Sequence, residues 1–123
     1  MTKVLLDTSF ILTAIRNKLD FPEELILKGH SIFIPKEVLS EIERIKNSTK
    51  SLKVRSEAEL ALKMIHSEAH KEISCPGKYV DSGIKNFLKD NPDFVLATVD
   101  AKLKRSVKNR KIIIRNKKKL ELQ

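Results

Sequence analysis

The sequence has little of several residue types, and each shortage excludes a class of protein. Its single cysteine, Cys75, cannot form an internal disulfide and has no second thiol for a Cys-X-X-Cys zinc or redox site. The glycines, Gly29, Gly77 and Gly83, are too far apart for the Gly-X-Gly-X-X-Gly and P-loop patterns that cradle phosphates. With five phenylalanines, one tyrosine and no tryptophan, the chain lacks a row of rings on which single-stranded bases could stack.

Long hydrophobic runs are missing as well. No run approaches the roughly 20 apolar residues of a membrane span. The short run Val4-Leu5-Leu6 is ended by Asp7 well before it reaches the length of a signal-peptide core. The 123 residues are 41% hydrophobic, which suits one compact domain with its own core. We therefore expect a cytoplasmic protein that does not associate with membranes and forms a single domain over residues 1–123.

Charge is unevenly distributed along the chain. Residues 101–123 contain ten Lys or Arg side chains and one acid, Glu121, and this excess equals the whole formal net charge of +9. A basic segment on an otherwise neutral chain is typical of a protein that binds phosphate groups, although it can equally be a solvated lysine-rich tail. We refer to residues 101–119 as the basic C-terminal segment. Its candidate phosphate-binding residues are Lys102, Lys104, Arg105, Lys117, Lys118 and Lys119.

Short hydrophobic runs alternate with helical patterns along the chain. Strands are predicted at residues 3–6, 31–34, 72–74, 94–99 and 111–115. Helices are predicted at residues 10–15, 22–27, 35–47, 51–70, 80–89 and 101–108. The longest of these is amphipathic, with apolar residues in steps of three and four. Such alternation predicts an α/β fold, with a central parallel sheet of about five strands covered by helices on both faces.

Four acidic residues follow strands of this predicted sheet. Asp7 comes directly after the first strand and Asp100 directly after the fourth, while Asp81 begins the helix after the short third strand. Glu41 lies about a turn and a half into the helix that follows the second strand. Sites in open parallel sheets form beyond the carboxyl ends of the strands. We therefore expect these four carboxylates to meet at one end of the sheet.

Each acid also has a simpler interpretation. The three aspartates all precede or begin helices, where Asp commonly caps free backbone N–H groups. On a helical wheel Glu41 lies nearer the apolar face than Glu37 or Glu43, which are therefore expected to be dispensable. A carboxylate that leans toward a core is unfavourable unless it is paired, hydrogen-bonded or bound to a metal. One such residue is ordinary, whereas four at the ends of strands favour a site for a divalent cation.

Four segments resemble the motifs of PIN-domain nucleases, in the same order and across essentially the whole chain. The segments are Val4-Leu5-Leu6-Asp7-Thr8-Ser9-Phe10-Ile11-Leu12, Pro35-Lys36-Glu37-Val38-Leu39-Ser40-Glu41-Ile42, Tyr79-Val80-Asp81-Ser82-Gly83-Ile84 and Phe94-Val95-Leu96-Ala97-Thr98-Val99-Asp100-Ala101-Lys102-Leu103. Each motif alone is weak, and the four at compatible spacing are specific. Two positions depart from common family patterns, because Ser82 stands where many relatives have a second acid and Val99 where many toxin-type members have Asn.

The resemblance implies a PIN-like three-layer α/β/α sandwich and a divalent-metal-dependent endoribonuclease that hydrolyses RNA phosphodiester bonds. Hard cations such as Mg²⁺ or Mn²⁺ offset negative charge on a phosphodiester under attack and lower the pKa of an attacking water. The catalytic, metal-binding acids would be Asp7, Asp100, Asp81 and Glu41, with the first two as principal ligands and the others acting directly or through water. The residues that orient a carboxylate or a water behind them would be Thr8, Ser9 and Thr98.

Two functional classes remain open. One is an active endoribonuclease, either the toxin of a toxin–antitoxin pair or an RNA-processing enzyme, whose partners beyond RNA would be an antitoxin or a ribosomal particle. The other is a non-catalytic RNA- or ribosome-binding module that keeps the fold. The complete set of acids favours the enzyme, since a module without activity has no chemical use for them. RNA would be bound by the basic C-terminal segment. Many relatives form dimers, so a homodimer is compatible with the resemblance.

Overall fold

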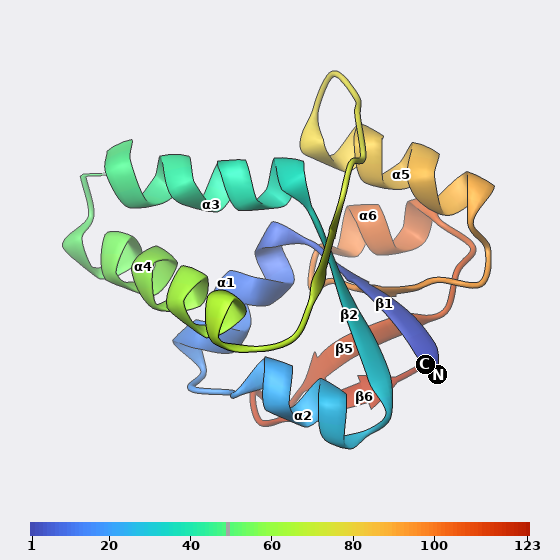
Figure 1. Cartoon of the computed structure of the whole chain (residues 1–123), viewed down its shortest axis with the longest axis horizontal. Helices are drawn as coiled ribbons and strands as arrows, with labels where there is room; N and C mark the ends of the chain where they lie inside the picture. The colour runs from blue at the N-terminus through green and yellow to red at the C-terminus, as the bar shows by residue number, and fades with distance from the viewer. Residues whose placement is uncertain (49) are drawn as a thin grey trace.

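The computed structural model describes residues 1–48 and 50–123, which form a six-stranded sheet with helices packed around it (Figure 1). The strands are β1 (Thr2–Leu6), β2 (His30–Pro35), β3 (Lys71–Ile73), β4 (Val95–Ala97), β5 (Lys111–Arg115) and β6 (Lys119–Leu122). The helices are α1 (Thr8–Arg16), α2 (Phe21–Leu27), α3 (Lys36–Ser48), α4 (Leu52–Ser67), α5 (Val80–Asp90) and α6 (Ala101–Ser106). None of the helices in this described part of the chain is long and apolar enough to cross a lipid bilayer.

The order of the strands creates one place where the sheet changes direction. Across the sheet the order is β3-β2-β1-β4-β5-β6, and neighbouring strands are parallel except β5 and β6. The chain moves outward from β1 through β2 to β3, then returns to the opposite side of β1 to form β4 and β5. In open parallel sheets such a reversal leaves a crevice beyond the carboxyl ends of the two central strands. Here those strands are β1 and β4, which end at Leu6 and Ala97.

Helices cover both faces of the sheet. On one face α1, α3 and α4 contact one another, and on the other α5 contacts α6. Right-handed crossovers place the two groups on opposite faces, because the connections run in opposite directions across the sheet. Figure 1 shows α1, α3 and α4 to one side of β1 and β2, with α5 and α6 to the other. The predicted three-layer sandwich around a mostly parallel sheet is therefore confirmed.

The core is centred on β1 and on the helix that follows it. Val4, Leu5 and Leu6 are all fully buried, because β1 is a central strand covered on both faces. Phe10 of α1 packs edge-to-face against Phe21 of α2, with 6.1 Å between the ring centroids. Burial of one Leu or Phe side chain contributes roughly 1.5–3 kcal/mol. This packing fixes the direction in which the chain leaves β1, and so the position of the residues that follow it.

The sixth strand, β6, is missing from the sequence-based prediction of about five strands. The turn that joins β5 to β6 holds Asn116 and Lys117 in the left-handed region, at φ values of 53° and 61°. Such backbone suits a tight hairpin, but the usual sequence signal is Asn-Gly, which is absent here. Because three lysines precede it, Leu120, the buried residue of β6, does not stand out in the sequence as part of a strand. The hairpin is therefore a correction to the prediction, and the short alternation Lys-Leu-Glu-Leu at residues 119–122 was the signal that could have indicated its second strand.

The hairpin is anchored against α2. The Lys28 ammonium donates a hydrogen bond of 2.7 Å to the Leu120 carbonyl oxygen. Arg115 and Glu121 form an ion pair across the hairpin, with 3.1 Å between Arg115 Nη2 and Glu121 Oε1. The basic C-terminal segment is therefore built into the fold as α6, β5, the turn and the start of β6. The side chains of residues 117–119 remain exposed, as the sequence predicts.

Several predicted boundaries are also wrong. The strand predicted at residues 94–99 ends at Ala97, because the buried Thr98 turns its side chain toward Asp7 at the end of β1. The helix predicted to begin at Pro35 begins one residue later, since Pro35 is the last residue of β2. The long amphipathic helix ends at Ser67 instead of continuing to residue 70.

Candidate active site

A cavity of about 320 Å³ opens at the carboxyl end of the sheet, beyond β1 and β4. The residues that line it are Asp7, Thr8, Ser9, Glu41, Ile45, Asp81 and Asp100. The cavity therefore collects all four predicted acids and two of the three predicted supporting hydroxyl residues. They come from four separate connections between strands and helices, and they meet where the strand order reverses.

Asp7 is the most deeply buried of the four acids, with 3% of its surface exposed. Its carboxylate accepts hydrogen bonds from Phe10 N at 2.8 Å, from Thr98 Oγ1 at 2.5 Å and from Ser9 Oγ at 2.9 Å and 3.0 Å. Burial raises the pKa of Asp7 to about 6 despite these donors, and the Asp81 carboxylate adds to the rise. Ionised Asp7 is thus fixed in place yet electrostatically unfavourable, a condition that a bound cation relieves.

Thr98 links the ends of β1 and β4. It is fully buried, and its hydroxyl donates to Asp7 while accepting a hydrogen bond of 3.0 Å from Asp100 N. Asp100 Oδ1 in turn accepts a hydrogen bond of 3.0 Å from Leu103 N and so caps α6. The cap uses one carboxylate oxygen and leaves the other available to the cavity. For Asp100, helix capping and cation binding are therefore compatible.

Asp81 lies in the first turn of α5 with its side chain exposed, and it does not cap the helix. The N-cap residue of α5 is Tyr79. Its backbone N–H donates a hydrogen bond of 3.0 Å to Ser82 Oγ, and the Ser82 hydroxyl donates one of 2.8 Å to the Tyr79 carbonyl oxygen. The simpler interpretation of Asp81 is therefore wrong. Partial burial, and then the Asp100 carboxylate, raise the pKa of Asp81, and the Lys85 ammonium opposes that rise.

Two glycines fix the position of Asp81. A Cβ added at Gly83 would lie 2.0 Å from the Cys75 carbonyl oxygen, and one added at Gly77 would lie 2.6 Å from Gly83 N. The first turn of α5 therefore packs backbone against backbone on the segment after β3, and a larger residue at either position would push the two apart. This close packing explains why a glycine follows Asp81-Ser82 in the third motif.

The acids of α3 have different partners. Glu41 Oε1 accepts a hydrogen bond of 2.5 Å from Thr8 Oγ1 at the cavity. Glu37 Oε1 instead accepts a hydrogen bond of 2.9 Å from Cys75 N and holds the segment after β3. Glu43 is exposed and forms a surface ion pair within α3. These contacts agree with the helical wheel, which turned only Glu41 toward the site.

The donor set suits a hard divalent cation. All four acids offer carboxylate oxygens, the ligand type that Mg²⁺ and Mn²⁺ prefer. Within residues 1–48 and 50–123, no three Asp, Glu, His or Cys side chains are grouped closely enough to hold an ion directly. Mg²⁺ usually keeps several waters and takes only one or two protein carboxylates. The arrangement therefore fits an ion with few direct protein ligands and water between it and the remaining acids.

Lys85 is a residue of the site that the sequence interpretation missed. Its charge acts on Asp81, as does that of Lys102 at the start of α6, one of the predicted phosphate-binding residues. Lys85 follows Asp81 by four residues, or about one helical turn, and this spacing was the available signal. Ile45 of α3 was also missed, and it supplies an apolar wall of the cavity.

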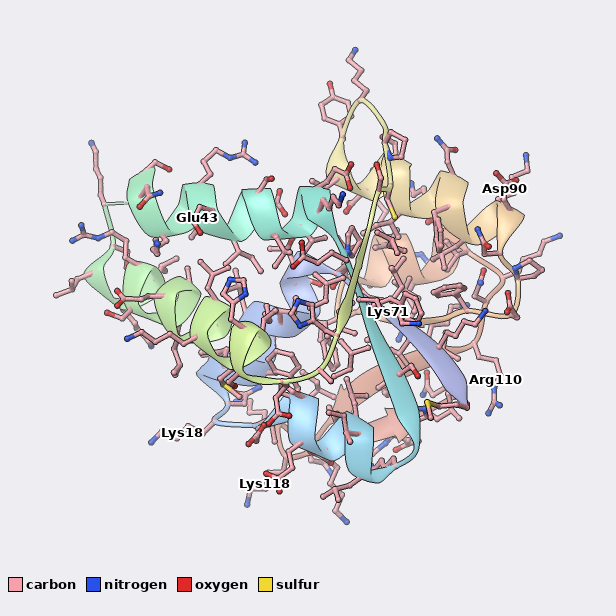
Figure 2. All side chains as sticks on the ribbon, viewed as in Figure 1. Lys18, Glu43, Lys71, Asp90, Arg110 and Lys118 are labelled. Atoms are coloured by element: carbon pink, nitrogen blue, oxygen red, sulfur yellow. The ribbon has the colours of Figure 1, made fainter. Side chains whose placement is uncertain are left out.

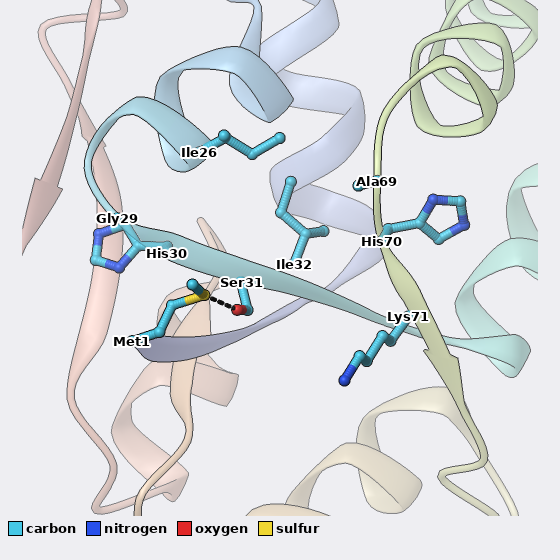
Figure 3. A pocket seen from close by; sticks show the side chains of 9 residues that line it. All are labelled: Met1, Ile26, Gly29, His30, Ser31, Ile32, Ala69, His70 and Lys71. Carbon is cyan, nitrogen blue, oxygen red and sulfur yellow. Dashed lines mark hydrogen bonds between the residues drawn. The ribbon is translucent and has the colours of Figure 1, made fainter.

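A cavity of about 330 Å³ lies at the opposite, amino end of the sheet (Figure 3). Met1, Ile26, Ile32 and Ala69 supply much of its apolar lining, and no acidic residue lines it. Among the described residues, His30 Nδ1 is the one buried side-chain polar atom without a hydrogen-bond partner. This cavity offers no carboxylate for a hard cation, so the carboxyl end of the sheet remains the candidate active site.

The fold is a three-layer α/β sandwich with an acid-lined cavity at the carboxyl end of its sheet, and comparison with known proteins identifies its family. A family model described as the PIN domain matches residues 4–120, a range that includes all four acids and both helical layers. The chain therefore belongs to the PIN-domain family. Among curated proteins, Ribonuclease VapC4 of Methanocaldococcus jannaschii is 27% identical over 128 residues, covering 99% of this chain and 97% of that protein.

Solved structures share the fold. The structure of the PIN domain endonuclease Utp24 matches with a TM-score of 0.78 and 22% identity, covering 98% of this chain and 90% of that one. A chain of VapBC2 from Rickettsia felis, crystallised with a DNA fragment from its promoter, matches with a TM-score of 0.50 and 18% identity, covering 89% and 98%. At these identities the likeness is one of fold.

Proposed function

We propose that this protein is a divalent-metal-dependent endoribonuclease that hydrolyses RNA phosphodiester bonds. The observation that carries the proposal is the single cavity in which Asp7, Glu41, Asp81 and Asp100 meet at the carboxyl end of the sheet. Membership of the PIN-domain family and the likeness to Ribonuclease VapC4 along nearly the whole chain support RNA as the substrate.

In this proposal Asp7 and Asp100 are the principal ligands of Mg²⁺ or Mn²⁺, and Asp81 and Glu41 complete the site directly or through water. The ion would supply charge compensation at the phosphate and a water of lowered pKa. The protein's own contribution is to hold oxygens in place before the substrate arrives. The donors around Asp7 allow its carboxylate little rotation, and the rise of its pKa by burial favours a partner of positive charge.

The supporting hydroxyl residues have distinct tasks. Ser9 and Thr98 both donate to the Asp7 carboxylate, and Thr8 donates to Glu41. No side chain is required as a covalent nucleophile, because water attacks the phosphate. Cys75, the one thiol of the chain, is buried, and burial raises its pKa to about 11, so it stays protonated and unreactive at neutral pH.

The basic C-terminal segment is proposed to bind RNA at two distances from the cavity. Lys102, Lys104 and Arg105 belong to α6, whose N-cap is Asp100, so they lie beside the acids. The lysines at 117–119 belong to the β5–β6 hairpin, and Figure 2 shows Lys118 near α2, at the opposite end of the view from α5. We expect α6 to contact RNA at the site, and the hairpin to act by longer-range attraction that salt screens.

The biological role is proposed as the toxin of a toxin–antitoxin pair or an RNA-processing nuclease, acting in the cytoplasm. The first role requires an antitoxin encoded beside it, and the second a ribosomal particle or another RNA-containing assembly; a homodimer is compatible with both. Growth arrest on expression, relieved by the product of a neighbouring small open reading frame, would assign the toxin role. Cofractionation with ribosomal particles without growth arrest would assign processing.

A cleavage assay tests the proposed activity. The purified full chain is incubated with single-stranded RNA of mixed sequence in EDTA, in Mg²⁺ and in Mn²⁺. We expect internal cleavage only with a divalent cation, and none with Asp100→Asn. Folded wild-type protein that binds RNA but leaves it uncut under every condition would instead be a non-catalytic RNA- or ribosome-binding module.

A further inference from the structure

Another cavity lies on the face of the sheet that α5 and α6 cover. Its volume is about 440 Å³, and it extends between the second half of α5 and the residues that end α6. Three lysines line it, Lys85, Lys89 and Lys108, and no acidic residue does. Asp90, next to Lys89 in sequence, lies at the far end of α5 (Figure 2) and is not part of the lining. The cavity is therefore a concentration of positive charge.

No acidic residue in the lining of this cavity offsets its three ammonium groups, although the Lys85 charge also acts on Asp81 outside it. Within the described residues none of them is in an ion pair. Like charges that share a cavity repel one another, and an anion placed among them removes that repulsion. A phosphate group has the charge and the acceptor oxygens to do so.

The cavity is held together by a buried side chain. Asn109 is 8% exposed, and its Nδ2 donates hydrogen bonds of 3.1 Å to the Asn91 carbonyl oxygen and 2.9 Å to the Phe94 carbonyl oxygen. The side-chain Nδ2 of Asn91 donates in turn to the Phe87 carbonyl oxygen of α5 at 2.8 Å. These bonds tie the end of α5 to the start of β5. Lysines from two separate connections are thereby kept on one cavity.

Lys85 connects this basic cavity to the acid cavity. It lines the first, and its charge acts on Asp81, which lines the second. Asp81, Lys85 and Lys89 recur at intervals of four residues, so they follow one side of α5 over about 12 Å. A stacked nucleic acid strand carries one phosphate per about 3.4 Å, so roughly three phosphates span that length.

We propose that the cavity between α5 and α6 binds the RNA backbone on one side of the cleavage site, with Lys85, Lys89 and Lys108 contacting its phosphates. The assignment of the neighbouring acid cavity as the cleavage site rests on the proposed function. Contacts to phosphate carry no information about base sequence. This cavity, which we call the groove, therefore positions RNA without selecting a particular sequence. Phosphate contacts also suit a chain with so few aromatic residues for base stacking.

One of the three lysines has a second role. Lys89 lies in the last turn of α5, where a cation stabilises the helix dipole. That role alone predicts a less stable Lys89→Gln variant with unchanged RNA affinity. Lys85, in the middle of α5, and Lys108, beyond α6, have no such role, so a loss of affinity in their single variants is attributable to RNA contact.

The test compares two triple variants of the full chain that lose the same charge. Lys85→Gln/Lys89→Gln/Lys108→Gln removes the charges of the groove. Lys18→Gln/Lys50→Gln/Lys53→Gln, the control, removes three exposed lysines that form no ion pair in the described chain. Figure 2 shows Lys18 on the opposite side of the molecule from α5. Binding of labelled single-stranded RNA is measured by fluorescence anisotropy in EDTA over a range of salt concentrations.

We expect the groove variant to bind RNA roughly tenfold more weakly at low salt, and the slope of log affinity against log salt to fall by about 2, at about 0.7 per phosphate contact. The control should change both quantities far less. The corresponding Lys→Arg triple, which keeps the charge, should restore binding. Equal losses of affinity in the groove and control variants, or no loss in the groove variant, would overturn the proposal that the groove binds RNA.

Because binding is measured without metal, the outcome is independent of cleavage. If the wild type cleaves RNA and the groove variant binds RNA as well as the control does, RNA binding by the groove is overturned and the proposed activity stands. A wild-type protein that never cleaves, with a groove variant that loses binding, overturns the proposed activity and supports the groove.

Discussion

The two ends of the sheet hold cavities of nearly equal size and opposite chemistry. The carboxyl end has about 320 Å³ lined by four carboxylates, and the amino end has about 330 Å³ with a largely apolar lining. The difference arises because helices begin at the carboxyl end, where their free N–H groups require acceptors, and end at the amino end, where they do not.

This comparison teaches that capping and chemistry share residues. Asp7 caps α1 and Asp100 caps α6, and both line the acid cavity. At the amino end the chain turns instead through residues such as Gly29, with φ at 84°, and no carboxylate gathers there. The N-caps of α1 and α6 thus supply two of the four carboxylates, and the acids at the carboxyl end of the sheet repel one another.

The largest expected effect is on activity at the carboxyl end. Asp7→Asn and Asp100→Asn should each lower metal-dependent RNA cleavage by about a hundredfold or more, since even the partners of metal ligands cost up to about a hundredfold when removed. Circular dichroism should show both variants folded. Initial cleavage rates in Mn²⁺, with contaminating nuclease excluded by a mock purification, measure the loss.

The matched control for that loss is an acid outside the cavity. Glu43→Ala should cleave at nearly the wild-type rate, because Glu43 is exposed on the surface of α3. Glu37→Ala should also keep activity, although it loses a hydrogen bond to Cys75 N and with it about 1 kcal/mol of stability. An inactive Glu37→Ala variant beside an active Glu41→Ala variant would mean that the second motif is assigned in the wrong register.

Glycines at the two ends provide the next comparison. Gly83→Ala brings a Cβ to 2.0 Å from the Cys75 carbonyl oxygen, so we expect a loss of about 3 kcal/mol in the free energy of unfolding and lower cleavage, as Asp81 is displaced. Gly29→Ala meets nothing within 4 Å and suffers only the strain of its positive φ, about 1 kcal/mol. Urea denaturation measures both. Equal losses would show that the close approach at Gly83 relaxes without cost.

A third prediction concerns how pH acts on Asp7. Its pKa rises from 3.8 in the unfolded chain to about 6 in the fold. Because the folded value is the higher one, the contribution of Asp7 to the stability of the metal-free wild type should be greatest below pH about 4 and fall by about 3 kcal/mol as the pH rises through about 6. Asp7→Asn should lack this loss and be the more stable protein at pH 7.

Metal should reverse that order. At a concentration about a thousandfold above its dissociation constant, a bound ion adds about 4.1 kcal/mol to the wild type, which exceeds the loss of about 3 kcal/mol. Asp7→Asn, without its principal ligand, should gain much less. Urea midpoints at pH 4 and pH 7, with EDTA and with Mn²⁺, provide the measurement. Parallel pH profiles of stability for the two proteins would mean that ionisation of Asp7 does not destabilise the fold.

The smallest expected effect lies in the hairpin, away from the acid cavity. Changing Lys117, Lys118 and Lys119 to Gln should weaken RNA binding and flatten its salt dependence, by at most about 2 in the slope if each lysine contacts a phosphate. Since the hairpin lies near α2, we expect a smaller change than in the groove of α5 and α6. Turnover at saturating RNA should stay near wild type. A collapse of turnover with intact binding would place the hairpin at the active site.

Several features of the fold and site follow from local patterns alone. Alternating strands and helices, the cap positions of Asp7 and Asp100, and the inward position of Glu41 each depend on residues within a few turns of one another. These are the features that a single chain can show, because helix and strand periods and cap preferences act over short separations. Their outcome in the structure agrees with the prediction, apart from boundaries such as the end of β4.

Other features depended on contacts between distant segments. Arg16 pairs with Glu57 of α4, which is 9% exposed, at 3.2 Å, although nothing near either residue indicates the pair. The strand β6 has an alternating sequence, Lys-Leu-Glu-Leu, but its place in the sheet depends on the burial of Leu120 and on contact with α2.

The sequence by itself determined the alternation of strands and helices, the order of the four acids and the concentration of positive charge near the C-terminus. Only the tertiary structure decided that the acids share one cavity, that Glu37 binds the segment after β3, and that two lysines of α5 share a cavity with Lys108 beyond α6. The physical reason is that strand order and helix packing bring together residues far apart in the chain, and burial there sets the pKa of Asp7.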